Sequence, residues 1–295
     1  MTPSGLLILN KPVGPTSHDV VEQVRRATGA RKVGHVGTLD PLAAGVLLVL
    51  VGNITRLSEY LVGHDKRYRA IVRFGRATDT YDAGGRMTRQ APVTFTESRL
   101  RAVLENLRGR QHQVPPSYSA VKVRGRKAYE MARAGEEVQL ESRVIEVYAL
   151  NLLRWTPPEA VLEIHCSSGT YVRTMAHELG MTLGAYAHLA GLTRTCIGHF
   201  CVDQAIDLEE LQEACRQGTW QKYLIPASEA LPELPLVRFS LEDAQWLQQG
   251  GRVKAAEGPS GLCRAVDDQG NLVAVVEWLA DFQAWQPKKV FPRDS

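Results

Sequence analysis

The sequence has 295 residues, of which 44% are hydrophobic and 23% are charged, as in ordinary soluble globular proteins with one large domain and a small one. No apolar run approaches the ~20 residues that cross a bilayer, and the N-terminal apolar run is too short for a signal peptide, so we expect a cytoplasmic protein. Five scattered cysteines predict reduced thiols and argue against a disulfide scaffold.

The net charge of +3 is small, but the positive charges are segregated along the chain. Residues 66–76 hold five Lys and Arg residues and no acid, and residues 101–133 hold eight against two glutamates. A phosphate-binding face requires such segregation, although a solvated basic surface is the alternative interpretation.

The first half of the chain predicts strands alternating with helices. Thr16 and Asp19 form a capping pair at the start of one helix, Gly29 ends it, and Asn53 is a candidate cap for the next. Strict alternation over 67–74 predicts a strand with one basic side. In chain order, the predicted elements are a strand at 6–9, a helix at 16–28, a strand at 46–51, a helix at 53–62, a strand at 67–74 and a helix at 96–107.

The second half begins with a Pro-bent, basic and aromatic segment, at about 110–140, which we predict to be an inserted, RNA-facing element. Beyond residue 226 prolines punctuate a linker, and short β elements predict a small module containing a helix capped by Ser240. The whole pattern predicts an α+β fold with a mixed sheet. The later elements are strands at 144–154 and 161–166, a helix through 171–179, segments at 189–200, a helix capped by Asp207, and a β-hairpin of 262–266 with 272–278.

A glycine-rich loop before the strand at 46–51 carries a single carboxylate, Asp40, next to Pro41. Gly34, Gly37 and Gly45 permit backbone angles and close approaches that larger residues resist. Such an aspartate can act as a nucleophile or general base, and an adjacent arginine would keep it ionised. Spacing alone does not choose among the arginines. A turn whose aspartate merely caps backbone N–H groups is the structural alternative.

Several other chemistries lack their sequence signatures. The chain has neither a P-loop motif nor a dinucleotide-binding G-x-G-x-x-G, and Ser168-Gly169 lacks the second glycine of a nucleophile elbow. The one metal-like cluster is Cys196, His199 and Cys201, without a companion C-x-x-C. A buried pair of thiols with a hydrogen-bonded histidine explains it better than zinc, so we expect neither metal nor cofactor.

The loop sequence GHVGTLDPLAAGVL at 34–47 resembles the signature of bacterial tRNA pseudouridine-55 synthases, the TruB type of pseudouridine synthase. Further family-like segments follow in the family's order, so that the resemblance covers about residues 4–200. These segments are NKP at 10–12, DKRY at 65–68, TDTYD at 78–82, PPSYSA at 115–120, CSSGTYVR at 166–173 and LTR at 192–194.

The resemblance implies the largely antiparallel mixed sheet of the pseudouridine synthase fold, with flanking helices, over 1–231. It also implies a small, mainly-β, PUA-like RNA-binding domain at 232–295. The implied activity is that of a tRNA isomerase, which flips out uridine 55 of the TΨC arm and breaks and re-forms its glycosidic bond with the help of an aspartate. No cofactor or protein partner is implied, and the enzyme is expected to be a monomer.

The resemblance also assigns roles to individual residues. Asp40 aligns with the catalytic carboxylate, Arg173 with its arginine partner and Tyr68 with the tyrosine that stacks on the flipped base. The implied substrate contacts are His35, Tyr68, Tyr171, Leu192, Lys11 and Asp82. The basic side chains expected along the RNA backbone are Lys66, Arg67, Arg124, Arg126 and Lys127. Whether Asp40 attacks the base, attacks the sugar or removes a proton stays open.

Two competing functions use the same surface. One is a non-catalytic tRNA-binding or RNA-folding protein, which would need neither Asp40 nor Arg173 as a pair. The other is an enzyme of the same class with a different RNA substrate.

Overall fold

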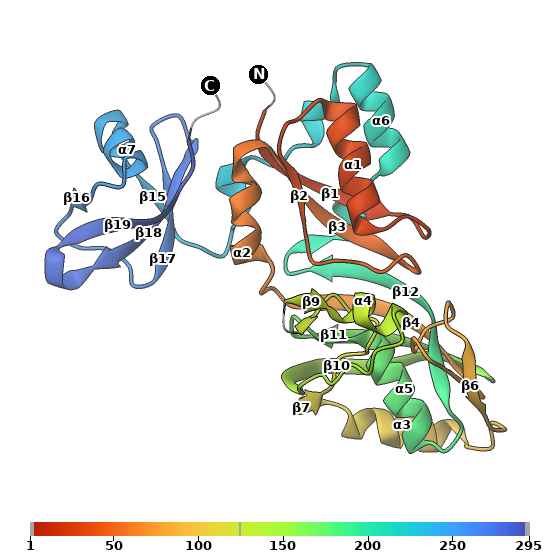
Figure 1. The fold of residues 1–295 in the computed structure, drawn as a ribbon. Coiled ribbons are helices and arrows are strands. Elements are labelled where there is room, and N and C mark those ends of the chain that lie inside the picture. The colour runs from red at the N-terminus through yellow and green to blue at the C-terminus, as the bar shows by residue number, and fades with distance from the viewer. Residues whose placement is uncertain (1–2, 124, 293–295) are drawn as a thin grey trace.

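Two large sheets form the framework of the protein, as Figure 1 shows for the computed structural model, which describes residues 3–123 and 125–292. The larger sheet has ten strands, in the order β14-β1-β3-β12-β4-β11-β10-β7, with β2 and β13 pairing beside β3 and β12. Its strands are β1 (Gly5–Lys11), β2 (Val33–Val36), β3 (Ala43–Val51), β4 (Lys66–Phe74), β7 (Gly109–Gln113), β10 (Arg143–Thr156), β11 (Glu159–Cys166), β12 (Ala187–Ile197), β13 (Phe200–Cys201) and β14 (Ile206–Asp207).

This sheet is mixed and largely antiparallel, which confirms the predicted fold class. Only the β1–β14 and β3–β12 pairs among its described strands are parallel. Strand β12 joins the two halves of the sheet, because it pairs with β3 on one side and with β4 on the other. The register places Arg194 of β12 beside both Gly45 and Tyr68. Residues from distant parts of the chain therefore meet at the centre of the sheet.

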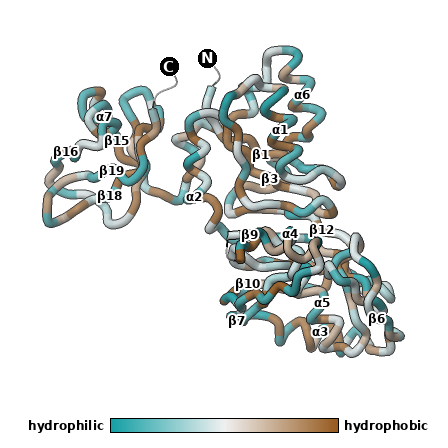
Figure 2. The backbone as a smooth tube through the Cα atoms, in the orientation of Figure 1, coloured by the Kyte–Doolittle hydropathy of each residue, from teal (hydrophilic) through white to brown (hydrophobic). Residues whose placement is uncertain are grey.

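Helices cover the ten-stranded sheet in separate groups (Figure 1). One group packs on β1 and β3, a second lies on the other face of the same strands, and a third packs on β4, β10 and β11. In Figure 2 the hydrophobic stretches follow the strands and the outer turns are mostly hydrophilic. The groups are, in that order, α1 (Ser17–Thr28) with α6 (Leu208–Arg216), the 3₁₀ helix η1 (Gly52–Leu57) with α2 (Ser58–Leu61), and α3 (Glu97–Asn106) with α5 (Val172–Thr182).

Local sequence signals explain most helix ends. Thr16 and Asp19 form the predicted capping box of α1, and Gly29 ends that helix with φ of 68°. The segment after β3 differs from the prediction, because it begins as a 3₁₀ turn in which Asn53 is not the cap. Asp207 does start α6, but its carboxylate accepts a hydrogen bond from Asn10 at 2.8 Å instead of capping the helix.

A hairpin and the predicted insertion lie next to α5. The hairpin of β5 (Arg76–Thr78) and β6 (Met87–Gln90) carries the loop 78–85. The predicted insertion contains β8 (Lys122–Val123), β9 (Arg126–Lys127) and the short helix α4 (Ala128–Arg133). Each element accepts a hydrogen bond from Arg173 of α5 through a backbone carbonyl, that of Thr80 or that of Tyr118.

The second sheet is the small β module expected near the C-terminus, drawn in blue in Figure 1. Its order is β15-β17-β18-β19-β16, and β17 with β18 forms the predicted hairpin. The module is not detached, because Leu272, Val275 and Phe291 pack in one apolar cluster with Leu57 and Leu61 of the first sheet's cover. Its elements are β15 (Leu236–Arg238), α7 (Leu241–Gln248), β16 (Val253–Lys254), β17 (Leu262–Val266), β18 (Leu272–Leu279) and β19 (Ala284–Val290).

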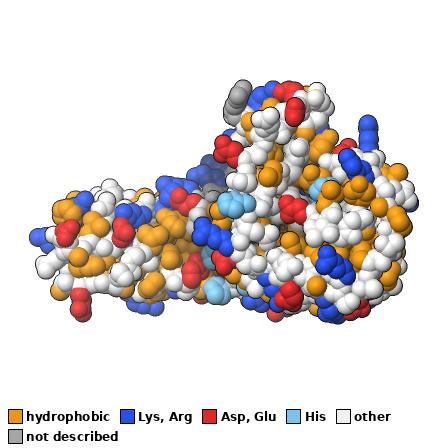
Figure 3. Space-filling view, turned by 90° about the horizontal axis from the view of Figure 1, so that it is seen from below, with side chains coloured by type: hydrophobic (Ala, Val, Ile, Leu, Met, Phe, Trp, Pro, Cys, Tyr) orange, Lys and Arg blue, Asp and Glu red, His pale blue; other side chains and the backbone are white. Residues whose placement is uncertain are grey.

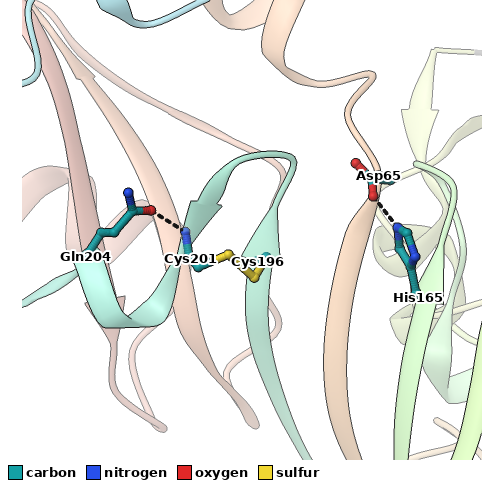
Figure 4. The surroundings of a disulfide bond; sticks show 5 residues. All are labelled: Asp65, His165, Cys196, Cys201 and Gln204. Atoms are coloured by element: carbon teal, nitrogen blue, oxygen red, sulfur yellow. Dashed lines mark hydrogen bonds and ion pairs between the residues drawn. A yellow bond between two sulfur atoms is a disulfide. The ribbon is translucent and has the colours of Figure 1, made fainter. Parts of the chain in front are cut away.

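The prediction of reduced thiols is wrong for one pair, since Cys196 and Cys201 form a disulfide (Figure 4). The β12–β13 hairpin makes these two residues direct cross-strand neighbours, a register that the sequence spacing alone does not reveal. His199 is exposed, so the expected buried thiol–histidine arrangement is wrong as well. The remaining cysteines, Cys166, Cys215 and Cys263, are free.

Candidate active site

Asp40 lies in the loop between β2 and β3, which is fixed from several directions. The Ser17 hydroxyl accepts a hydrogen bond from the Leu39 N–H at 2.8 Å and donates one to the Leu39 carbonyl at 3.0 Å. The Asp40 carbonyl accepts from the Ala43 N–H at 3.0 Å, and the Pro41 carbonyl from the Gly14 N–H at 2.8 Å. Leu39 is buried while the Asp40 side chain is 44% exposed. The loop therefore presents one carboxylate outward from a rigid backbone.

Arg173 of α5 is the cation beside that carboxylate, with its Nε 2.9 Å from Asp40 Oδ2. The rest of the guanidinium is also engaged: it donates to the Thr80 carbonyl at 3.2 Å and to the Tyr118 carbonyl at 2.9 Å, and lies 3.5 Å from Asp82 Oδ2. Arg173 is only 6% exposed, so these contacts fix its orientation. One planar group thus connects the Asp40 loop, the loop 78–85 and the start of the insertion.

Opposing influences act on the charge of Asp40. Burial raises the pKa of the carboxyl above its ordinary value, Arg173 lowers it, Asp82 raises it, and Lys11 lowers it. The arginine thus offsets part of the desolvation cost of an ionised Asp40. A half-buried carboxylate with a raised pKa beside a fixed cation is typical of a reactive group.

Tyr68 lies beneath the loop on the inner side of β4 and is 8% exposed. Burial raises the pKa of its hydroxyl, and the nearby charge of Arg194 lowers that pKa. Leu192, two residues before Arg194 on β12, is half-buried and packs against the core cluster that contains Tyr68. The structure therefore brings Tyr68 and Leu192, both predicted substrate contacts, into the same core cluster.

The sequence interpretation missed Arg194 as a site residue. This arginine is 1% exposed, and it donates from Nε to the Val46 carbonyl at 2.8 Å and from the terminal nitrogens to the Gly37 and Thr38 carbonyls at 2.7 and 3.4 Å. It holds the segment that leads to Asp40. The available signal was a lone arginine in a strand that, apart from His188, holds only apolar and small residues.

Gly37 and Gly45 of the loop lie against Arg194 of β12. Gly45 has φ of 99°, and a Cβ there would lie 2.2 Å from the Arg194 carbonyl oxygen. Gly37 has φ of 68°, and a Cβ there would lie 3.4 Å from the Arg194 guanidinium. Gly45 is therefore required for the close approach of β12, whereas at Gly37 the left-handed backbone favours glycine.

Two lysines expected to face RNA are buried, so these predictions are wrong. Lys11 is 0% exposed and donates to the Pro12 and Ala43 carbonyls at 2.9 and 2.7 Å. Lys66 is also buried, and its ammonium contacts the Val62 and His64 carbonyls. Burial lowers the pKa of each lysine to about 8. Backbone carbonyls take the place of water around these ammonium groups, which sequence patterns do not show.

The other predicted substrate contacts, His35 and Tyr171, lie on β2 and at the start of α5. His35 is half-buried on β2, with Nε2 3.5 Å from the Thr38 hydroxyl, and burial lowers the pKa of its imidazole. The Tyr171 ring, at the start of α5, lies under the Arg143 guanidinium, 5.5 Å from the ring centroid. Gln113, another residue that the sequence did not indicate, bonds both the N–H and the carbonyl of Tyr171.

The predicted phosphate contacts in the insertion are only partly described. Arg124 lies outside the described residues. Arg126 is paired with Glu136 through bonds of 2.8 and 3.0 Å, and Lys127 is exposed above the Tyr129 ring. Arg67 is exposed on β4, on the side away from Tyr68. On the face shown in Figure 3, basic and acidic side chains are interspersed.

In residues 3–123 and 125–292, no three His, Cys, Asp or Glu side chains gather in a group that could hold a metal ion. Within the same ranges, no helix is long and apolar enough to cross a membrane.

Comparison with known proteins relates this geometry to a family. Residues 25–172 match the TruB family pseudouridylate synthase N-terminal domain, and residues 173–232 match the tRNA pseudouridylate synthase B C-terminal domain. The chain is 41% identical over 277 residues to tRNA pseudouridine synthase B of Enterobacter sp. strain 638, covering 90% of this chain and 88% of that protein. It is 40% identical over 287 residues to tRNA pseudouridine synthase B of Escherichia coli K12, and the match covers 93% of this chain and 91% of that protein.

Solved structures agree on the fold. A chain in the crystal structure of a Cbf5–Nop10–Gar1 complex superposes with a TM-score of 0.74 at 25% identity, covering 98% of this chain and 85% of that one. A chain of an H/ACA RNP bound to a substrate RNA containing 2′-deoxyuridine also superposes with a TM-score of 0.74 at 24% identity. The match covers 98% of this chain and 86% of that one.

Proposed function

The chain belongs to the TruB family of pseudouridylate synthases, and from this premise we propose that it converts uridine 55, in the TΨC arm of tRNA, to pseudouridine. The observation that carries the proposal is the contact of 2.9 Å between Arg173 and the half-exposed carboxylate of Asp40. A protein that only binds or folds tRNA does not need a buried arginine to orient an outward-facing acid. The non-catalytic alternative is therefore disfavoured.

The reaction is an isomerisation, so atoms and electrons balance within the substrate. The C1′–N1 bond breaks, the base turns while bound, C1′ bonds to C5, and the proton on C5 is lost while N1 gains one. The uridine must first leave the stack to reach a carboxylate set in this loop. Asp40 is the reactive group, in one of three roles: attack on the base, attack on the sugar or removal of a proton.

The surrounding residues have proposed roles consistent with their positions. Tyr68 provides a ring for stacking on the extruded base, and Leu192 and Tyr171 form walls of its pocket. His35 is neutral at pH 7, because burial lowers the pKa of its imidazole, and it takes the place of the flipped nucleotide in the RNA. Asp82 acts chiefly through Arg173, which it approaches to 3.5 Å.

Phosphate contacts are assigned to Arg67, Arg124, Arg126 and Lys127. These charges fit a polyanionic partner because three of them lie exposed on β4 and β9. We propose that residues 1–231 form the catalytic domain and 232–295 the RNA-binding domain. We further propose that the protein acts as a cytoplasmic monomer without a protein partner.

The test is turnover of a TΨC stem-loop by the Asp40→Asn variant. We expect it to abolish pseudouridine formation while changing RNA affinity by less than about tenfold, or ~1.4 kcal/mol. Asp203→Asn is the matched control, since it makes the same chemical change at an exposed position. Retained turnover in Asp40→Asn would refute the catalytic role, and an inactive wild type would refute the function itself.

A further inference from the structure

The loop 78–85 supplies two of the oxygen atoms that surround Arg173. The Thr80 carbonyl lies 3.2 Å and Asp82 Oδ2 3.5 Å from the same guanidinium nitrogen. Asp82 is anchored in turn, because its Oδ1 accepts from the Thr80 hydroxyl at 2.7 Å and from the Gly84 N–H at 3.0 Å. The conformation of this loop therefore contributes to the direction in which Arg173 points, together with Asp40 and the Tyr118 carbonyl.

Tyr81 stands between these two residues and has an unusual backbone. Its φ is +63°, in the left-handed region that residues with a Cβ adopt rarely. Its carbonyl accepts from the Leu189 N–H of β12 at 2.9 Å. Return of Tyr81 to a negative φ would rotate the adjoining peptide groups, and with them the Thr80 carbonyl and the Asp82 side chain.

The Tyr81 ring is stacked on His177, with ring centroids 3.9 Å apart and an angle of 12° between the planes. His177 follows Arg173 by four residues on α5, so the two side chains lie on the same face of the helix. The loop therefore meets α5 at two points one turn apart. One is the polar contact with Arg173 and the other is this stack.

The stack with Tyr81 contributes to holding the His177 ring. Within the described residues, the buried Nδ1 of His177 has no hydrogen-bond partner. Burial lowers the pKa of this imidazole, so it is neutral at pH 7 and the stack is between uncharged rings. The stack thus adds aromatic contact to the hydrogen bonds that Tyr81 makes through its N–H to Thr78 and through its carbonyl to Leu189.

We propose that Tyr81 and His177 are positioning residues for the reaction: their stack keeps the loop 78–85 in the conformation that aligns Arg173 with Asp40. This inference rests on the proposed function and adds two residues to it that lie outside the family-like roles assigned above. Neither residue contacts Asp40 in the structure, so the stack acts through Arg173.

The experiment compares variants that keep the stack with variants that remove it. Tyr81→Phe and His177→Phe keep two stacked rings, whereas Tyr81→Ala and His177→Ala do not. Turnover of a TΨC stem-loop is followed over pH, and the carboxyl of Asp40 is titrated by ¹³C NMR in the substrate-free protein. Asp40 faces Arg173, Asp82 and Lys11, and these groups are unchanged in all four variants.

We expect Tyr81→Ala to lower kcat by about tenfold or more with KM within about twofold, and to raise the Asp40 titration midpoint. The Phe variants should stay within about threefold of wild type. If Tyr81→Ala does not fold, His177→Ala removes the same stack from the helix side and has the same expected result.

Two results would overturn the inference. One is a folded Ala variant with wild-type kcat and an unmoved Asp40 titration. The other is a Phe variant as impaired as its Ala counterpart, because the stack would then not be the active feature. An inactive wild type would refute the proposed function, yet the Asp40 titration would still decide whether the stack sets the Asp40–Arg173 alignment.

Discussion

Replacing Arg194 by Met tests whether this buried cation holds the catalytic loop. The methionine fills similar space but cannot donate to the Val46, Gly37 and Thr38 carbonyls. The bond to Val46 is buried, and the bonds to Gly37 and Thr38 are partly buried. Taking a net contribution of ~1 kcal/mol for each of these three hydrogen bonds, we expect the free energy of unfolding to fall by about 3 kcal/mol.

Thermal unfolding measures the loss of stability, and steady-state kinetics measure the effect on turnover. A loss of about 3 kcal/mol corresponds to a fall in Tm of about 6–12 °C for a chain of this size. Below the new Tm, kcat should also fall, because the Gly37 and Thr38 carbonyls lie just before Asp40 in the loop. Arg69→Met is the matched control, as Arg69 is exposed on the neighbouring strand β4. If Arg194→Met has the same Tm and kcat as Arg69→Met, Arg194 does not hold the catalytic loop.

Further predictions concern pH, salt and thiols. Arg173→Lys should move the acid limb of kcat/KM to higher pH, because Arg173 lowers the pKa of Asp40 and less ionised Asp40 then remains in acid; an unmoved limb would contradict the pairing. Glu136→Gln should release Arg126 for phosphate, so that binding to the stem-loop tightens a few-fold and its salt dependence steepens; unchanged affinity and slope would place Arg126 away from RNA. Alkylation of denatured protein should modify three cysteines without reductant and five after reduction, whereas five in both would exclude the disulfide.

The sequence predicted the parts of the site that carry a recognisable pattern. Asp40 stands alone in a glycine-rich loop, and Arg173 lies in a family-like segment, so both could be named before their contact of 2.9 Å was seen. The alternation along β4 likewise predicted that Tyr68 faces inward and Arg67 outward. These inferences worked because period and motif are local properties of the chain.

Buried charge and long-range pairing could not be predicted in this way. Lys11, Lys66 and Arg194 look like surface residues, because most lysines and arginines are exposed unless paired. Their partners are carbonyls of irregular segments, which become available only when the sheet has formed. The contact of Tyr81 with His177 spans 96 positions of the chain, so it too depends on tertiary structure.

The central position of β12 has a consequence for synthesis of the protein. Until Ala187–Ile197 has emerged from the ribosome, β3 and β4 each have an edge whose later partner is missing. Both strands are largely apolar on their inner sides, and unpaired apolar edges favour association between chains. Ribosome-bound chains that end before residue 187 should therefore be the species most in need of a chaperone.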